Sequence, residues 1–201
     1  MKKMFKIIGI VVTFMFFSLV ANAATIVVTW NANVETDLAG YGIYDNNVLV
    51  GSTAVLATPT FSILNAVDGV HSVTLDAFDT SGNRSLKSDA VSITIDTVPC
   101  AIPAKPTAVA TGSSVKLTWV ANTDADLAGY GIYHDGVLAG SIGVMASPTY
   151  TVASLPDGSH TFTIDSVDTA GNRSAKSAAT IIATDISAPV KPTNLKVIWS
   201  K

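Results

Sequence analysis

Cysteine, histidine and charge are all scarce in this chain of 201 residues. It contains one cysteine, three histidines and 13% charged residues, and its formal net charge is −3. A single cysteine cannot form a disulfide within the chain, so packing alone must hold each domain together. Binding to nucleic acid requires a basic patch, and none is visible in the sequence. We therefore expect no nucleic-acid partner.

Motifs of catalysis are also missing. The sequence has no nucleophile elbow, no glycine loop that would cradle a phosphate, and no spacing of His and Cys typical of metal ligands. Its histidines are His71, His134 and His160, of which the first and last repeat each other and His134 falls in a turn. Because catalysis needs converging groups, we predict that the protein is not an enzyme and carries no cofactor, with calcium as the one possible ion.

The one long apolar run lies at the N-terminus. Three lysines precede an apolar stretch over residues 7–20, and Ala21-Asn22-Ala23 then supplies the small-x-small pattern of a signal-peptidase site. The stretch is shorter than the roughly 20 residues that span a bilayer. We predict a signal peptide over 1–23, with an uncleaved anchor as the alternative. The mature chain would have no membrane span and would be periplasmic, cell-surface or extracellular.

An internal repeat dominates the rest of the sequence. The octapeptide DLAGYGIY occupies residues 37–44 and again 126–133, and the same offset carries Trp30 onto Trp119. It also carries GNRS at 82–85 onto GNRS at 171–174. Self-similarity at a fixed offset indicates duplicated structural units.

Within each unit the side chains alternate with a period of two. Ile26, Val28 and Trp30 alternate with other residues, and the segments 72–77 and 161–166 do the same. Such alternation predicts strands with one buried and one wetted face. Turn signals separate the runs at short intervals, and no helical spacing is sustained after the signal segment. We predict an all-β protein of two tandem antiparallel β-sandwiches.

Each unit resembles a fibronectin type III domain. Trp30 or Trp119 ends strand B, GYGIY forms strand C, and AFDTSGNRS or SVDTAGNRS ends strand F. His71 and His160 stand where that family usually has a tyrosine that bonds back to the E–F turn, and bacterial immunoglobulin-like domains are the nearest alternative. A neutral imidazole can donate one ring N–H to a backbone carbonyl, so histidine could replace the tyrosine bond.

The predicted organisation has five parts. They are the signal peptide at 1–23, domain 1 at 24–97, a Pro-rich linker at 98–105, domain 2 at 106–185 and a tail at 186–201. Domain 1 lacks a clear strand A, whereas Lys191-Pro192-Thr193 in the tail repeats the start of strand A in domain 2. Pro192–Lys201 could therefore add a strand to domain 1 of another chain and build a head-to-tail filament. The alternative is a tail that frays or folds back on domain 2.

Oxygen-bearing side chains are expected to gather where the B–C and F–G loops meet. The two sets are Glu35, Asp37, Asp79 and Asn83 in domain 1, and Asp124, Asp126, Asp168 and Asn172 in domain 2. Calcium takes about six to eight oxygen ligands, so each set is a candidate calcium site. Turn formation is the favoured explanation, because Asp and Asn side chains bond nearby backbone N–H groups.

Three further residues are candidates for binding or cross-linking. Tyr44 and Tyr133 are expected to point outward beside glycines, where they could stack on sugar rings or cover a sheet face. Cys100 lies in the Pro-rich connector and could join two chains by a disulfide or remain a free thiol.

These features predict a non-catalytic secreted or surface protein that acts as a spacer, adhesion or interaction module. By analogy with the fibronectin type III family, its partner would be a protein or polysaccharide at the cell surface. The alternatives are a filament subunit completed by the C-terminal strand, and an accessory module for a separately encoded carbohydrate-active enzyme.

Overall fold

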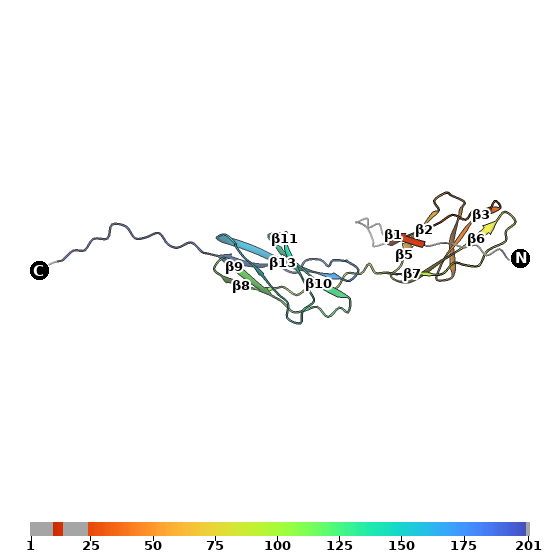
Figure 1. The fold of residues 1–201 in the computed structure, drawn as a ribbon. Coiled ribbons are helices and arrows are strands. Elements are labelled where there is room, and N and C mark those ends of the chain that lie inside the picture. The colour runs from red at the N-terminus through yellow and green to blue at the C-terminus, as the bar shows by residue number, and fades with distance from the viewer. Residues whose placement is uncertain (1–9, 14–23, 200–201) are drawn as a thin grey trace. The chain divides into compact units, whose positions relative to one another are not determined.

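The computed structural model describes residues 10–13 and 24–199 (Figure 1). The chain divides into two compact units, Met1–Val98 and Pro99–Lys201, here called unit 1 and unit 2. All regular elements of the described residues are strands, which confirms the predicted all-β class. In that part of the chain no helix is long and apolar enough to cross a membrane.

Unit 1 is a sandwich of two antiparallel sheets, with strand orders β1-β2-β5 and β4-β3-β6-β7. Its strands are β1 (Ile10–Thr13), β2 (Ala24–Trp30), β3 (Leu38–Asp45), β4 (Val48–Ala54), β5 (Thr60–Ala66), β6 (Gly69–Asp79) and β7 (Val91–Ile95).

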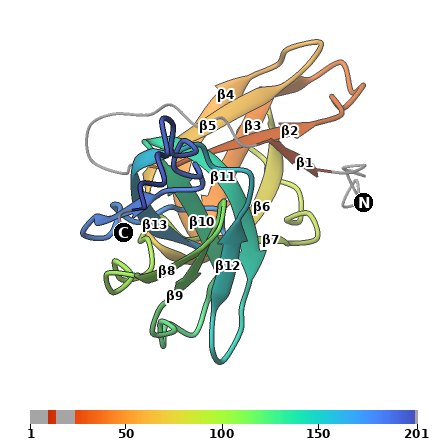
Figure 2. The same ribbon diagram turned by 90° about the vertical axis from the view of Figure 1, so that its left-hand side faces the viewer.

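Unit 2 repeats this plan, with strand orders β12-β9-β8 and β11-β10-β13-β14. Its strands are β8 (Thr107–Thr111), β9 (Ser114–Thr118), β10 (Leu127–His134), β11 (Val137–Gly143), β12 (Thr149–Val152), β13 (Gly158–Asp168) and β14 (Thr180–Thr184). Figure 2 shows β8, β9 and β12 as neighbours in the smaller sheet.

An edge-to-face aromatic pair lies in the core of each unit. The ring centroids of Trp30 and Tyr41 are 5.1 Å apart, and those of Trp119 and Tyr130 are 5.3 Å apart. Both tyrosines are fully buried, and the Tyr41 hydroxyl accepts a hydrogen bond of 2.6 Å from the backbone N–H of Asn33. Aromatic pairs in this geometry add to the free energy gained by burying their surface. The repeated tryptophans are therefore core residues, as the alternation predicted.

The outer face of strand F differs from the prediction. Val73, Leu75 and Ala77 of β6 point into the core as expected, but Asp76 on the face expected to be wetted is only 4% exposed. In β13 the equivalent Asp165 is 3% exposed. The cause is an arginine that folds over this face from the GNRS segment.

The edge of β2 carries the short strand β1. Val12 of β1 pairs with Val28 of β2, just as Ala108 of β8 pairs with Leu117 of β9 in unit 2. Strand β1 therefore takes the place of the strand A that seemed absent from domain 1. It belongs to the predicted signal peptide, whose other residues lie outside the described part of the chain, and cleavage stays a prediction.

The predicted linker is partly packed onto unit 2. Cys100, Pro103 and Pro106 are buried, and Cys100 joins the core that contains Trp119. At the other end of unit 2, the backbone N–H of Ile186 donates to the Asp157 carboxylate at 2.6 Å.

The rest of the tail is extended and open. Residues 188–199 form no strand with the described residues, and Leu195 and Val197 are 89% and 88% exposed. Over residues 188–199 the tail therefore does not fold back on unit 2. Whether it pairs with another chain stays a prediction.

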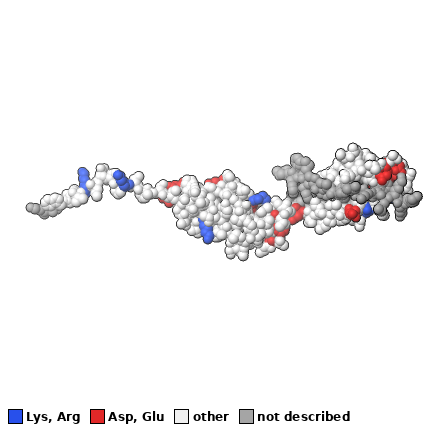
Figure 3. Space-filling model, in the orientation of Figure 1, with Lys and Arg blue, Asp and Glu red and all other residues white. Residues whose placement is uncertain are grey.

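Basic side chains are scattered over the face drawn in Figure 3. On the face drawn in Figure 3, Lys and Arg among the described residues form no continuous patch. Phosphate binding requires clustered basic side chains, and the absence of a nucleic-acid partner stays a prediction.

Candidate functional site

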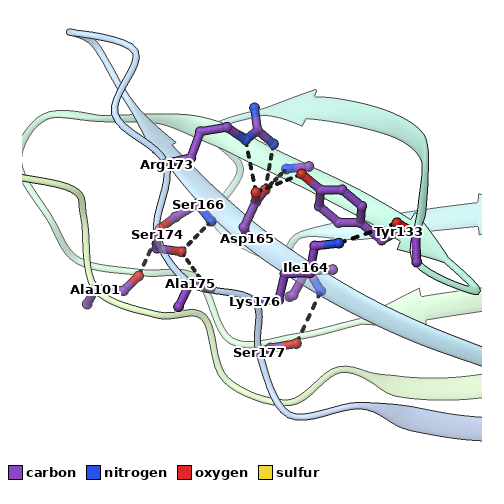
Figure 4. A network of polar contacts seen from close by, with 12 residues as sticks. Ala101, Tyr133, Ile164, Asp165, Ser166, Arg173, Ser174, Ala175, Lys176 and Ser177 are labelled. Carbon is purple, nitrogen blue, oxygen red and sulfur yellow. Dashed lines mark hydrogen bonds and ion pairs between the residues drawn. The ribbon is translucent and has the colours of Figure 1, made fainter. Parts of the chain in front are cut away.

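A buried carboxylate organises the outer face of the larger sheet in unit 2. Asp165 accepts hydrogen bonds from the Arg173 guanidinium, through Nε at 2.9 Å and Nη2 at 2.6 Å, and from the Tyr133 hydroxyl at 2.8 Å (Figure 4). A buried charge is costly unless it is paired and hydrogen-bonded. The Arg173 guanidinium supplies the opposite charge, and together with the Tyr133 hydroxyl it supplies hydrogen bonds to the buried Asp165 carboxylate.

Gly131 makes room for this ion pair. Its N–H donates to Asp165 Oδ1 at 3.2 Å, and a Cβ added here would lie 2.6 Å from the same oxygen and would overlap the Arg173 guanidinium. Only glycine leaves the space, which explains one invariant position of the repeated octapeptide.

Unit 1 builds the same network. Asp76 accepts hydrogen bonds from Arg84 Nη1 at 2.6 Å and from the Tyr44 hydroxyl at 2.9 Å. A Cβ on Gly42 would lie 2.6 Å from Asp76 Oδ1. The duplicated sequence therefore encodes a duplicated polar cover for the sheet.

The predicted sugar-stacking tyrosines are members of these networks. The ammonium groups of Lys87 and Lys176 lie 3.6 Å from the ring centroids of Tyr44 and Tyr133 respectively. Partial burial, reinforced by the hydrogen bond to Asp165, raises the pKa of Tyr133, and the same causes raise the pKa of Tyr44 through Asp76. Each tyrosine thus has its hydroxyl and one ring face occupied by the protein. Sugar stacking stays a prediction.

The side chains of the GNRS segment form a set of turn contacts. Gly171 has a φ of 92°, a left-handed conformation that favours glycine. Asn172 donates to the Asp168 carboxylate from its backbone N–H and from its side-chain amide, both at 2.8 Å. Ser174 Oγ accepts the backbone N–H of Ser166 at 3.0 Å.

The first predicted calcium set lies in the B–C and F–G loops of unit 1. Asp79 accepts hydrogen bonds from the backbone N–H groups of Ser81 and Asn83, both at 2.9 Å, and from the Asn83 amide at 2.8 Å. The Asn83 side chain is the main cause that lowers the pKa of Asp79. The carbonyl of Asp37 accepts the N–H of Thr80 at 2.9 Å, and the carbonyl of Glu35 accepts that of Leu38 at 3.3 Å. These hydrogen bonds stabilise the turns, as the favoured explanation predicted.

The second set behaves in the same way. Asp168 is 2% exposed and is bonded by Asn172, while Asp124 accepts the backbone N–H of Ala101 at 3.0 Å. That backbone contact is the main cause that lowers the pKa of Asp124. Asp126 holds the loops together through its carbonyl, which accepts the N–H of Thr169 at 2.8 Å. Calcium binding at either set stays a prediction.

Cys100 is a core residue of unit 2. It is 5% exposed, and its Sγ lies 3.5 Å from Asp126 Oδ1. Burial, followed by the hydrogen bond to Asp126, raises the pKa of the Cys100 thiol to about 12. A disulfide between chains forms through an exposed thiolate. The predicted cross-link would therefore require this thiol to leave the core.

His71 and His160 each make the predicted hydrogen bond to a backbone carbonyl of the E–F turn. His71 Nε2 lies 2.8 Å from the carbonyl oxygen of Val67, and His160 Nε2 lies 3.0 Å from that of Pro156. These carbonyls can only accept, so each ring carries a proton on Nε2. The imidazole thus replaces the phenol of the usual tyrosine corner.

The other nitrogen of each corner histidine differs between the units, which the sequence reading did not anticipate. His71 Nδ1 lies 2.6 Å from Asp45 Oδ2, whereas His160 Nδ1 lies 2.9 Å from His134 Nε2. The signal that would have found this difference is a mismatch between the repeats, Asp45-Asn46 against His134-Asp135.

Comparison with known proteins relates the chain to parts of bacterial polysaccharide-degrading enzymes. Chitinase A1 of Niallia circulans is 34% identical over 174 residues, which cover 82% of this chain and 24% of that protein. Exoglucanase B of Cellulomonas fimi is 34% identical over 179 residues, which cover 82% of this chain and 16% of that protein. The chain thus spans about a quarter or less of these relatives. No family model matches it.

Among solved structures, the chain is similar to the fibronectin(III)-like modules of CbhA from Clostridium thermocellum. The TM-score is 0.54 at 18% identity, covering 80% of this chain and 85% of that one. With the strand orders given above, each unit is a β-sandwich of the immunoglobulin-like class. The chain therefore has the fold of fibronectin type III modules, as the resemblance predicted.

Proposed function

We propose that this chain is a non-catalytic, extracellular accessory module of a polysaccharide-degrading system, in which it acts as a spacer. The observation that carries the proposal is that one stretch of sequence matches both a chitinase and an exoglucanase. These enzymes are named for different polysaccharides, so a stretch that they share is not what selects the substrate. The predicted signal peptide supports an extracellular location.

The polar groups of the two units support a spacer more than a binding site. The carboxylates of Asp76 and Asp165 are held by arginine, and those of Asp79 and Asp168 by their own turns. A spacer needs a rigid sandwich and an inert surface, whereas a binding site needs groups left available to a ligand.

A replacement experiment tests the role as a spacer. The matching stretch of the Niallia circulans chitinase is deleted, or replaced by residues 24–199 of this chain. We expect deletion to lower hydrolysis of insoluble chitin and replacement to restore it, with hydrolysis of a short soluble substrate unchanged throughout. A folded replacement that performs no better than the deletion would contradict the proposal.

Sedimentation with insoluble polysaccharide tests the alternative, binding through the tyrosines. Purified chain is mixed with chitin or cellulose, beside the variants Tyr44→Ala and Tyr133→Ala. A spacer leaves all three proteins in the supernatant. Pelleting that is lost in either variant would make the chain a binding module instead, and release of sugar by the chain alone would make it an enzyme.

A further inference from the structure

Three potential metal ligands converge at one end of unit 2. His134 Nε2 lies 2.9 Å from His160 Nδ1 and 2.9 Å from Asp135 Oδ2, and the last two atoms are 3.8 Å apart. With bonds of about 2.0–2.1 Å, a tetrahedral zinc ion separates its ligand atoms by roughly 3.3 Å. The three distances fall around that value, so one ion could contact all three atoms.

Local structure explains how these side chains meet. His134 ends β10 and pairs with Phe162 of β13, while His160 lies two residues earlier on the same face of β13. The His134 ring stacks on Phe162 with centroids 5.0 Å apart. Asp135 and Gly136 form the turn to β11 with φ of 49° and 86°, the left-handed pair of a tight hairpin.

Second contacts aim two of the ligands at the shared point. His160 Nε2 faces the carbonyl oxygen of Pro156 at 3.0 Å and Thr184 Oγ1 at 3.1 Å, so its Nδ1 presents a lone pair to the cluster. Asp135 Oδ1 accepts the backbone N–H of Thr161 at 2.8 Å, which leaves Oδ2 turned toward the histidines. Metal-binding histidines and carboxylates commonly have such partners.

Solvent reaches the cluster from one side. The side chain of His160 is 5% exposed, whereas those of His134 and Asp135 are 25% and 50% exposed. Because His134 and Asp135 are partly exposed, a metal ion could reach the cluster from solvent. A water molecule could then occupy a further coordination position.

Unit 1 provides an internal comparison, because its described residues form no such cluster at the equivalent positions. The positions of His134 and Asp135 are held there by Asp45 and Asn46, and His71 takes the place of His160. Asn46 Oδ1 accepts the N–H of Ser72 at 3.0 Å, but its Nδ2 donates to Val70 O at 3.2 Å. An amide N–H cannot coordinate a cation, so unit 1 keeps only an Asp45–His71 hydrogen bond.

We infer that His134, Asp135 and His160 form a binding site for a divalent transition-metal ion such as Zn²⁺ in unit 2. Two imidazoles and one carboxylate suit Zn²⁺ and its neighbours in the first transition row, and do not suit Ca²⁺ or Mg²⁺, which prefer oxygen ligands. The ion would tie the β10–β11 turn to the start of β13. The site does not depend on the proposed function.

The first test measures metal stoichiometry on the full, tag-free chain after treatment with a chelator. Calorimetric titration with Zn²⁺ should give one saturable site per chain, and Ca²⁺ at the same concentration should not compete for it. Zn²⁺ should raise the melting temperature of unit 2, and chelator should reverse the rise. Absence of saturable Zn²⁺ binding would overturn the proposal and leave a hydrogen-bonded His–His–Asp cluster.

The second test exchanges residues between the two units. The variant H134D/D135N gives unit 2 the residues that unit 1 already accommodates, so it should keep its fold and lose the Zn²⁺ site. The reciprocal variant D45H/N46D should raise the stoichiometry from one to two. Zn²⁺ binding by H134D/D135N that equals the wild type would place the ion elsewhere and refute the assignment.

Discussion

Gly131 has its place in the repeated octapeptide because a charged pair packs against its Cα. Any side chain at this position would meet Asp165 and Arg173 on the outer face of the sheet. The sequence showed that the glycine recurs but gave no reason for it. The reason lies in Arg173, 42 residues further along the chain, whose position depends on the complete fold.

The substitution Gly131→Ala should destabilise unit 2 by about 1–3 kcal/mol, the usual cost of forcing extra volume into a packed site. The added methyl must displace the guanidinium and loosen a buried carboxylate. Urea denaturation followed through amide NMR signals of unit 2 measures the effect separately from unit 1.

Gly143→Ala is the matched control for Gly131→Ala. Gly143 ends the neighbouring strand β11, and a Cβ there would meet no atom within 4 Å. We expect its effect on the free energy of unfolding to stay within about 0.5 kcal/mol, as for most surface substitutions. Equal effects of the two substitutions would contradict the steric explanation.

At the scale of elements, the alternation of side chains predicted the strands well because burial of one face is local to each strand. Ile26, Val28 and Trp30 of β2 are all buried as expected. The same rule failed for the outer face of β6 and β13, since a segment from elsewhere covers it. The His134 cluster was missed for a related reason, because it joins a turn to a strand that pairs with β10.

The contact between the β3–β4 turn and β6 predicts a pH dependence in unit 1. Burial is the largest influence on His71 and by itself lowers its pKa, but the hydrogen bonds to Val67 and Asp45 and the charge of Asp45 together raise it above the usual 6.5. A folded pKa above the unfolded one means that protonation stabilises the fold. This stabilisation is complete below the unfolded pKa and is lost as pH rises through the folded pKa.

Unit 1 should therefore unfold more easily at pH 8 than at pH 6, and Asp45→Asn should reduce this difference. Titration of the His71 ring protons by NMR in both proteins measures the pKa directly. A wild-type value at or below 6.5 would refute the prediction.

At the scale of the whole molecule, the duplication could be predicted from the sequence, whereas the boundaries of the two units could be predicted less well. The repeat, the sandwich class and the core tryptophans follow from spacing and alternation. The segment 98–105 resembled a linker because of its prolines, yet Pro103 and Cys100 pack into unit 2. Proline content predicts restricted backbone freedom, but it does not tell which surface a connector lies against.

The buried thiol predicts that the intact molecule resists oxidation to a dimer. With a pKa of about 12, Cys100 holds almost no thiolate at neutral pH. Native protein should react with a thiol reagent far more slowly than protein in concentrated urea, and should migrate as a monomer on a non-reducing gel. Rapid native labelling, or a dimer that disappears with reductant, would restore the predicted cross-link.

Strand β1 links maturation to architecture. The described part of unit 1 has seven strands, and one of them lies within the predicted leader. A protease that cuts after Ala23 would leave the first sandwich with six, and the outer backbone groups of β2 would lose their hydrogen-bonding partners. Precursor and processed protein would then present different surfaces to their surroundings, with an unpaired edge appearing only after export.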